Sequence, residues 1–225
     1  MSADTFEEEY YLLYPSDISE YPLIYEDCNR TECPYKENPM CEDREDCPTY
    51  FAQKSKINNP APLVMDFFTD ITKKEAVYAD CYFPFTLSGG SFAVSDKLYN
   101  ILSGLGLEGI QFFPVTLLEN NEEKYSGFRY VHIYNILPVL DEKNSKYQQI
   151  GTTKNSNNLL EIKFKTNTLK NIPLEKRLVF KFPLKRSYFI FHNSVTGKIM
   201  SVNPSGLQFV KISEYSLPNS DKIFV

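Results

Sequence analysis

Two stretches of this chain repeat the same order of residue types, and this repeat restricts the fold more than any other feature. The first begins with Phe92-Ala-Val-Ser-Asp and the second with Phe189-Ile-Phe-His-Asn. Each reaches a Gly-apolar-Gln-Phe sequence 17 residues after its first Phe, at Gly109 and Gly206. Such a match indicates a repeated supersecondary unit, although two ordinary β–α–β stretches could also match by chance. We predict that 92–113 and 189–210 form equivalent strand–helix–strand units.

The first of these stretches carries a clear helix signal. The Ser95 hydroxyl can accept a hydrogen bond from an amide of the first turn, and Asp96 follows at the positive end of the helix dipole. Apolar residues then share one helical face: Leu98, Ile101 and Leu102. Glycines at 104 and 106 can adopt the left-handed conformation that ends a helix. We predict a helix from Asp96 to near Ser103, with Asn193 as the cap of the second copy.

Strand signals dominate the rest of the chain. It has 17 Phe and 16 Tyr, and aromatic rings favour strands because they pack well on a pleated surface. Between Leu159 and Lys165 apolar and polar residues alternate, as in a half-buried strand. The strand candidates are 10–14, 63–68, 110–113, 130–137, 159–165, 178–182 and 188–191, whereas 141–158 is polar and predicts a mobile loop. The predicted fold class is α+β, with a mixed, mostly antiparallel sheet and a few short helices.

Charge is distributed unevenly along the chain. Residues 1–50 hold 14 acidic and 3 basic residues, whereas the other 175 hold 15 acidic and 21 basic ones. We therefore divide the chain into an acidic, Cys-rich arm, 1–55, and an α+β body, 56–225. The arm either folds back onto the body or presents a negative surface to a basic partner. The sequence shows neither a secretory signal nor an apolar run long enough to span a membrane, so we expect a cytoplasmic protein.

The segment from Phe92 to Val115 resembles a recurrent segment of bacterial immunity proteins. These proteins belong to polymorphic toxin systems, in the families numbered eleven and forty-three. The similar features are an apolar strand, a Ser cap, a short helix ending near Leu-x-Gly and an aromatic strand. The ending Ser205-Gly-Leu-Gln-Phe-Val-Lys-Ile and the opening Tyr10-Tyr-Leu-Leu are similar as well. The resemblance implies that the chain neutralises a cognate toxin by tight, non-catalytic binding, and it does not extend to residues 16–55.

The strongest local feature of the arm is a group of four cysteines within 20 residues: Cys28, Cys33, Cys41 and Cys47. In a reducing compartment clustered thiols suggest zinc before disulfides, and four thiolates satisfy tetrahedral Zn²⁺. The spacing, C-x4-C-x7-C-x5-C, departs from the tighter C-x2-C pairs of most structural zinc sites. One structural zinc and unligated thiols therefore both stay open. Cys81 lies apart and is predicted to be a buried apolar residue.

Catalysis has few candidate residues. The chain has only two histidines, and both His132 and His192 suit structural or surface positions better than the role of a general base. Lysines and arginines interleave with aromatic residues between Lys163 and Arg186, which is a modest signal for nucleic acid. Alternation explains several of these cations as one solvated strand face. The acidic arm would also repel nucleic acid, so we expect no nucleic-acid partner.

These patterns favour a non-catalytic immunity protein whose partner is a toxin protein. The alternative is a zinc-stabilised module that binds protein or nucleic acid. The acidic arm would supply the partner-binding residues, with charges at Glu42, Asp43, Glu45 and Asp46 and aromatic anchors at Tyr21, Tyr25 and Tyr35. Tyrosine is enriched among the residues that dominate interface energies.

Overall fold

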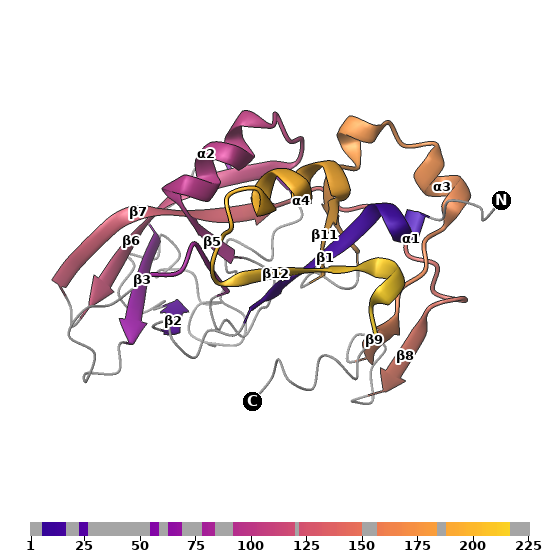
Figure 1. The fold of residues 1–225 in the computed structure, drawn as a ribbon, viewed down its shortest axis with the longest axis horizontal. Coiled ribbons are helices and arrows are strands. Elements are labelled where there is room, and N and C mark those ends of the chain that lie inside the picture. Colours follow the sequence, from indigo (N-terminus) through magenta and orange to yellow (C-terminus); the bar gives the residue numbers. More distant parts are fainter. Residues whose placement is uncertain are drawn as a thin grey trace.

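Strands form the body of the molecule, and most of the helices lie along one side of them (Figure 1). The computed structural model describes residues 6–16, 23–26, 55–58, 63–68, 78–83, 92–119, 122–149, 157–183 and 188–216. The helices are α1 (Phe6–Glu9), α2 (Asp96–Gly104), α3 (Thr166–Lys170) and α4 (Asn193–Met200), with 3-10 turns η4 (Leu174–Lys176) and η5 (Ile212–Glu214).

The strands of the described ranges form two larger sheets and a hairpin. The first sheet has the order β10 (Val179–Lys181), β11 (Phe189–His192), β1 (Tyr10–Pro15) and β12 (Leu207–Lys211). The second has the order β2 (Leu23–Glu26), β3 (Leu63–Phe68), β6 (Ile110–Glu119), β7 (Glu122–Ile133), β5 (Phe92–Ser95) and β4 (Cys81–Tyr82). The hairpin joins β8 (Lys146–Gln149) and β9 (Asn157–Glu161). Neighbouring strands pair antiparallel, except β3 with β6, so the predicted α+β class is confirmed.

The two repeated stretches have the same sequence of elements. The first is β5, α2 and β6, and the second is β11, α4 and β12. Gly109 and Gly206 precede the second strand of each and have positive φ angles of 74° and 82°. Helix α2 runs from Asp96 to Gly104, which confirms the predicted start and places the end one residue later.

The repeat includes the strand pairing around each stretch. In the first unit β7 lies between β5 and β6, and β4 flanks β5. In the second unit β1 lies between β11 and β12, and β10 flanks β11. The middle strand is antiparallel to both of its neighbours in each unit, so the helix connects two parallel strands across it. The middle strand β7 follows its unit directly in sequence, whereas β1 comes from the opposite end of the chain.

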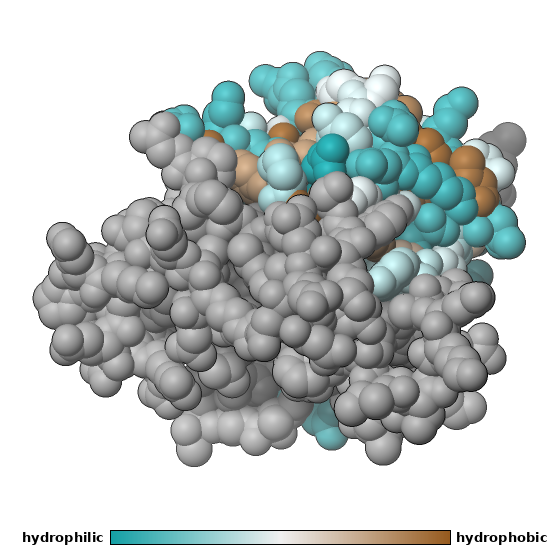
Figure 2. All heavy atoms as spheres, turned by 90° about the vertical axis from the view of Figure 1, so that its left-hand side faces the viewer, coloured by the Kyte–Doolittle hydropathy of each residue, from teal (hydrophilic) through white to brown (hydrophobic). Residues whose placement is uncertain are grey.

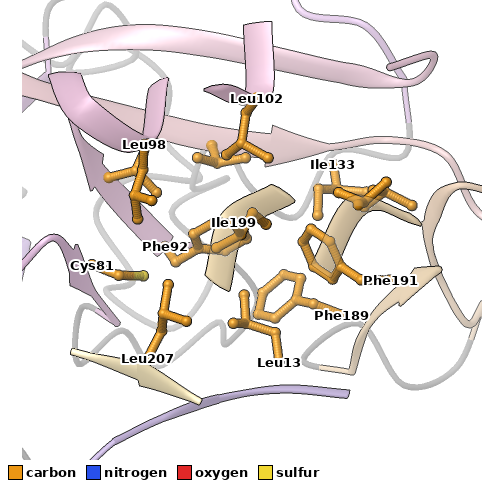
Figure 3. Close-up of a cluster of buried hydrophobic side chains, with 14 residues drawn as sticks. Leu13, Cys81, Phe92, Leu98, Leu102, Ile133, Phe189, Phe191, Ile199 and Leu207 are labelled. Atoms are coloured by element: carbon orange, nitrogen blue, oxygen red, sulfur yellow. The ribbon is translucent and has the colours of Figure 1, made fainter. Parts of the chain in front are cut away.

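One hydrophobic core joins the two units. Its 14 buried residues include equivalent pairs from the two copies, namely Phe92 with Phe189, Val94 with Phe191, Leu98 with Val195, and Leu102 with Ile199. The rings of Phe92 and Phe189 meet edge to face with centroids 5.1 Å apart. Figure 3 shows the labelled side chains of α2 and α4 directed toward these rings. The equivalent faces of the two units therefore pack against each other.

Both predicted helix caps need correction. Ser95 occupies the cap position of α2, but its hydroxyl makes no capping bond and donates instead to the carboxylate of Asp80 at 2.9 Å. Helix α4 is capped by His192 and not by Asn193, which is its first residue. Imidazole can replace the usual Ser or Asn because its unprotonated nitrogen also accepts a hydrogen bond from a first-turn amide.

Three further details bear on the sequence-based expectations. Residues 146–149 and 157–161 pair as β8 and β9, so the predicted loop over 141–158 contains a hairpin strand. The alternating segment 159–165 is a strand only as far as Glu161, although Ile162 and Phe164 remain buried as the alternation predicts. Within the segment predicted to be an arm, residues 10–15 and 23–26 pair with strands of the body.

Candidate partner-binding surface

Most of the predicted site residues lie outside the described ranges. These are the four clustered cysteines, the four carboxylates and two of the tyrosines: Cys28, Cys33, Cys41, Cys47, Glu42, Asp43, Glu45, Asp46, Tyr21 and Tyr35. Tyr25 belongs to β2, where its backbone pairs with Asp66 of β3. The zinc site and the acidic interface therefore stay predictions.

The described part of the chain contains no group of three or more His, Cys, Asp or Glu that could hold a metal ion. Cys81 is fully buried in the core between the units, and burial raises the pKa of its thiol. Its sulfur points into the cluster in Figure 3. A protonated, buried thiol is unreactive, so Cys81 packs as a small apolar side chain, as predicted.

His192 is surrounded by polar groups at the start of α4. Its Nδ1 accepts a hydrogen bond from the backbone N–H of Ser194 at 3.2 Å and lies 2.9 Å from the hydroxyl of the same residue. Its Nε2 lies 3.6 Å from the Glu9 carboxylate. Burial lowers the pKa of His192, the nearby Glu9 opposes this effect, and the Arg177 guanidinium adds to it.

This carboxylate–imidazole–hydroxyl order is also the order of a hydrolase triad, but the geometry favours a structural role. The lone pair of Nδ1 is already directed at the helix amide, which would otherwise be unsatisfied. Arg177 donates to the Tyr10 hydroxyl at 2.7 Å, and the Tyr10 ring packs edge to face on His192. The cluster therefore fixes β1 beside β11 and the start of α4.

His132 attaches the segment 55–58 to the six-stranded sheet. The imidazole is fully buried, and its Nε2 lies 3.0 Å from the carbonyl oxygen of Ser55. Gln111 bonds both the N–H and the C=O of Ile57, at 2.7 and 2.9 Å. Because a carbonyl can only accept, Nε2 carries the proton, and Nδ1 is a buried acceptor with no hydrogen-bond partner among the described residues. Both predicted structural roles of the histidines agree with these contacts.

Asp80 connects the two units through polar contacts. Its carboxylate accepts hydrogen bonds from the Ser95 hydroxyl, the Lys97 ammonium and the backbone N–H of Ser205, at 2.9, 2.9 and 3.1 Å. Burial raises the pKa of Asp80, but these donors together outweigh it, so the pKa is lowered and the group stays ionised. A carboxylate with this many donors is a structural anchor.

Helices α3 and α4 and the turn η4 each carry an exposed lysine that has no ion pair among the described residues. Elsewhere in the described ranges most cations are paired: Lys97 with Asp80, Arg129 with Asp96, Lys146 and Lys163 with Glu161, and Lys211 with Glu8. Lys170, Lys176 and Lys198 are exposed, and no carboxylate of the described ranges pairs with them. The two exposed large hydrophobic residues of the described part, Leu174 and Met200, lie on η4 and α4.

We call these five residues, Lys170, Leu174, Lys176, Lys198 and Met200, the basic face. Figure 1 shows α3 and α4 on the same side of the molecule, and the backbone N–H of His192, the cap of α4, donates to the carbonyl of Leu178, two residues after η4. Figure 2, seen from the left-hand side of Figure 1, shows that the described residues at the top of the molecule are mainly hydrophilic, with hydrophobic residues between them. Sequence reasoning found Lys170 and Lys176 only as part of a basic run, and it missed Lys198 and Met200. One feature of the sequence could have indicated this surface: Gly197 lies inside the helix directly before Lys198.

A family model for the immunity protein family Imm11 matches residues 37–214. The chain belongs to this family. Its membership confirms the resemblance to immunity family eleven. No curated protein matches the chain closely enough to count as a relative.

The Imm11 match covers both repeated stretches, from β3 to η5, together with the predicted acidic cluster. It begins after β1, although β1 is the middle strand of the second unit. Among the described helices of this Imm11 protein, none is long and apolar enough to cross a membrane.

Proposed function

We propose that this protein protects its cell by binding one cognate toxin directly, in a stoichiometric complex and without catalysis. Membership of the immunity protein family carries the proposal. The contacts of the titratable groups support it, since Asp80, His132 and His192 each hold a strand, a loop or a helix end in place. Toxin chemistry would be blocked by occlusion or distortion of the toxin's active site.

The test uses the cognate toxin domain, which is to be sought among the genes that neighbour this protein's own. Co-expression is expected to restore growth, and the two proteins are expected to co-elute as a complex of fixed stoichiometry. Toxin recovered from the complex by denaturation and refolding is expected to regain full activity with an unchanged mass. Covalent modification of the recovered toxin would show enzymatic immunity instead, and failure of the pair to associate would refute direct binding.

The acidic arm is proposed to contribute to this interface. Opposite charges on two proteins accelerate their association, and exposed rim charges act mainly on the association rate. Replacing Glu42, Asp43, Glu45 and Asp46 by Gln or Asn is expected to slow association with the toxin at low salt and to leave the folded state unchanged. Stopped-flow kinetics at two salt concentrations measures this, and an unchanged rate at low salt would contradict it.

The four arm cysteines are proposed to bind one structural zinc ion. Thiolate ligands would fix a segment too polar to fold by itself. Metal analysis of protein purified without chelator is expected to give about one zinc per chain. Serine at Cys28, Cys33, Cys41 and Cys47 is expected to abolish it, whereas Cys81→Ser serves as the control. Four freely titrating thiols in the native protein would reject the site.

A further inference from the structure

We propose that the basic face of α3, η4 and α4 is a docking surface for an acidic patch on the toxin. This inference rests on the proposed function and adds a second surface to it, distinct from the acidic arm. The partner chemistry is a carboxylate-rich protein surface with an apolar depression at its centre.

No carboxylate of the described residues neutralises the charges of the basic face. Cations in the rest of the described chain lie within 4.0 Å of a carboxylate in most cases, whereas Lys170, Lys176 and Lys198 are exposed and show no such contact there. Glu175, which lies between Leu174 and Lys176, is the exposed acidic residue of this region. Like charges kept together without partners repel each other, and an acidic partner surface removes that repulsion on binding.

Apolar side chains lie within the same face. Leu174 and Met200 are each 44% exposed, and among the described residues they are the large hydrophobic side chains classed as exposed. Protein interfaces combine a small apolar centre with a charged or polar rim. Methionine suits this position because its flexible thioether adapts to an irregular partner surface.

The outer side of α4 carries no side chain at Gly197, next to Lys198. Gly197 lies in the interior of the helix, and a Cβ added there would have nothing within 4 Å. Folding therefore gains nothing from glycine at this exposed position, where Ala would favour the helix. A missing side chain allows another backbone to approach α4 closely, which gives this glycine a role in binding.

Burial of the aromatic residues favours a protein over a nucleic acid. Single-stranded nucleic acid is bound by exposed aromatic rings beside cations. The rings that interleave with the lysines of this region are buried, with exposed fractions of 4% for Phe164 and 0% for Phe180 and Phe182. Lys181 is buried as well, and Lys163 pairs with Glu161. What remains exposed is aliphatic and cationic, which suits a carboxylate-rich protein surface.

Two charge-reversed variants test the proposal. Lys176→Glu with Lys198→Glu changes the face, and Lys56→Glu with Lys143→Glu is the matched control, because those two lysines are also exposed and outside the face. Both variants change the net charge by the same amount. Association with the purified toxin domain is measured by stopped flow at low and high salt, after thermal unfolding has shown that both variants fold.

The face variant is expected to associate about tenfold more slowly at low salt, with a smaller difference at high salt, and the control to change less than about threefold. Met200→Ser is expected to accelerate dissociation several-fold. If the wild type binds the toxin but both double variants associate alike, the docking face is wrong and the proposed function stands. If the wild type does not bind the toxin, the docking face and the proposed function are both wrong. A third outcome concerns duplex DNA. If the wild type and the control variant bind DNA, the face variant does not, and toxin binding is the same in all three, then the face binds nucleic acid and the proposal is overturned.

Discussion

Single residues decide how closely the two units approach each other. Gly206 has a positive φ, and a Cβ at this position would collide with the carbonyl oxygen of Cys81 in the other unit. The N–H of Cys81 also donates to the carbonyl of Ser205, next to this glycine. Backbone contact between the units therefore depends on the absence of a side chain at Gly206, whereas Gly197 has no such constraint.

Substitution of these two glycines by alanine is expected to have opposite effects on stability. Gly206→Ala is expected to lower the free energy of unfolding by about 2 kcal/mol or more, because it combines a strained φ with a backbone clash. Gly197→Ala is expected to raise it by about 1 kcal/mol, since alanine has the higher helix propensity. Urea unfolding of the two variants measures both. Equal effects would show that the units do not meet closely at Gly206.

His132 gives the fold a defined pH dependence. Burial lowers the pKa of His132, the hydrogen bond to Ser55 opposes this, and the nearby Lys181 charge adds to it. The unfolded state therefore binds more protons than the folded state between the lowered pKa and the ordinary value of 6.5. Stability is complete above pH 6.5 and declines as the pH falls below it. His192 has a pKa lowered in the same direction and adds to the decline.

His132→Gln is expected to reduce this decline. The Gln amide can still donate to the carbonyl of Ser55 but does not titrate. The free energy of unfolding, measured in urea at pH 7.5, 6.5 and 5.5, is expected to fall less steeply in the variant, with the remaining slope due partly to His192. An identical slope in wild type and variant would mean that His132 is not the group that titrates.

At the scale of elements, the two helices and the strands beside them behave as one packing unit. Phe92 of β5 and Phe189 of β11 occupy equivalent positions and touch edge to face across the boundary. Aromatic pairs of this kind are coupled by about 0.5–1.5 kcal/mol beyond the area that they bury. The stability of one unit should therefore depend on the side chains of the other.

A double-mutant cycle measures that dependence. Phe92→Leu and Phe189→Leu are each expected to lower the free energy of unfolding, and the double variant to lose less than the sum by about 0.5–1.5 kcal/mol. Phe92→Leu with Phe164→Leu is the control pair, because the two rings belong to different clusters. That pair is expected to be additive within about 0.5 kcal/mol. Additivity of the first pair would refute coupling between the units.

Local patterns in the sequence were sufficient to predict these elements. The spacing of Leu98 and Leu102 and the glycines after them gave α2, and the ungapped match at Gly206 gave the second unit. The hydroxyl of Ser95 was mistaken for a cap because its partner Asp80 becomes a neighbour only in the fold. His192 was overlooked because imidazole is an unusual capping group, although it accepts from the N–H of Ser194, two residues later. The basic face was missed because whether a lysine is paired depends on tertiary contacts that no spacing reveals.

For the molecule as a whole, the least predictable feature was the place of β1. Its apolar residues indicate a strand, but its partners lie at the other end of the sequence, where Leu12 pairs with Ile190 and with Val210. In the first unit β6 continues directly into the middle strand β7. The two units therefore differ in how the middle strand is connected to the rest of the chain. Lys211, at the end of β12, lies opposite Tyr11 near the start of β1.

A circular permutant is therefore expected to fold. Removing residues 1–16 is expected to abolish cooperative unfolding, because the second unit loses its middle strand. Attaching residues 6–16 after Val225 through a short Gly/Ser linker is expected to restore it, since β12 would then lead into β1 as β6 leads into β7. Circular dichroism and thermal unfolding of both proteins measure this. A permutant as disordered as the truncated chain would contradict the equivalence of β1 and β7.

The position of β1 between β11 and β12 also determines when the protein can finish folding during its synthesis. The first unit is complete once Ile133 has left the ribosome, but β1 must wait until Lys211 has followed. From Pro15 to Lys211 the ribosome adds 196 residues, so at about 5–20 residues per second β1 waits on the order of 10–40 s for its second neighbour. Until β11 and then β12 have been made, the apolar segment Tyr10–Pro15 lacks its native neighbours and can pair with other nascent chains. The first residues to be synthesised are thus among the last to pair in the sheet. A chain released before β12 is made has all strands of the first unit but lacks part of the second.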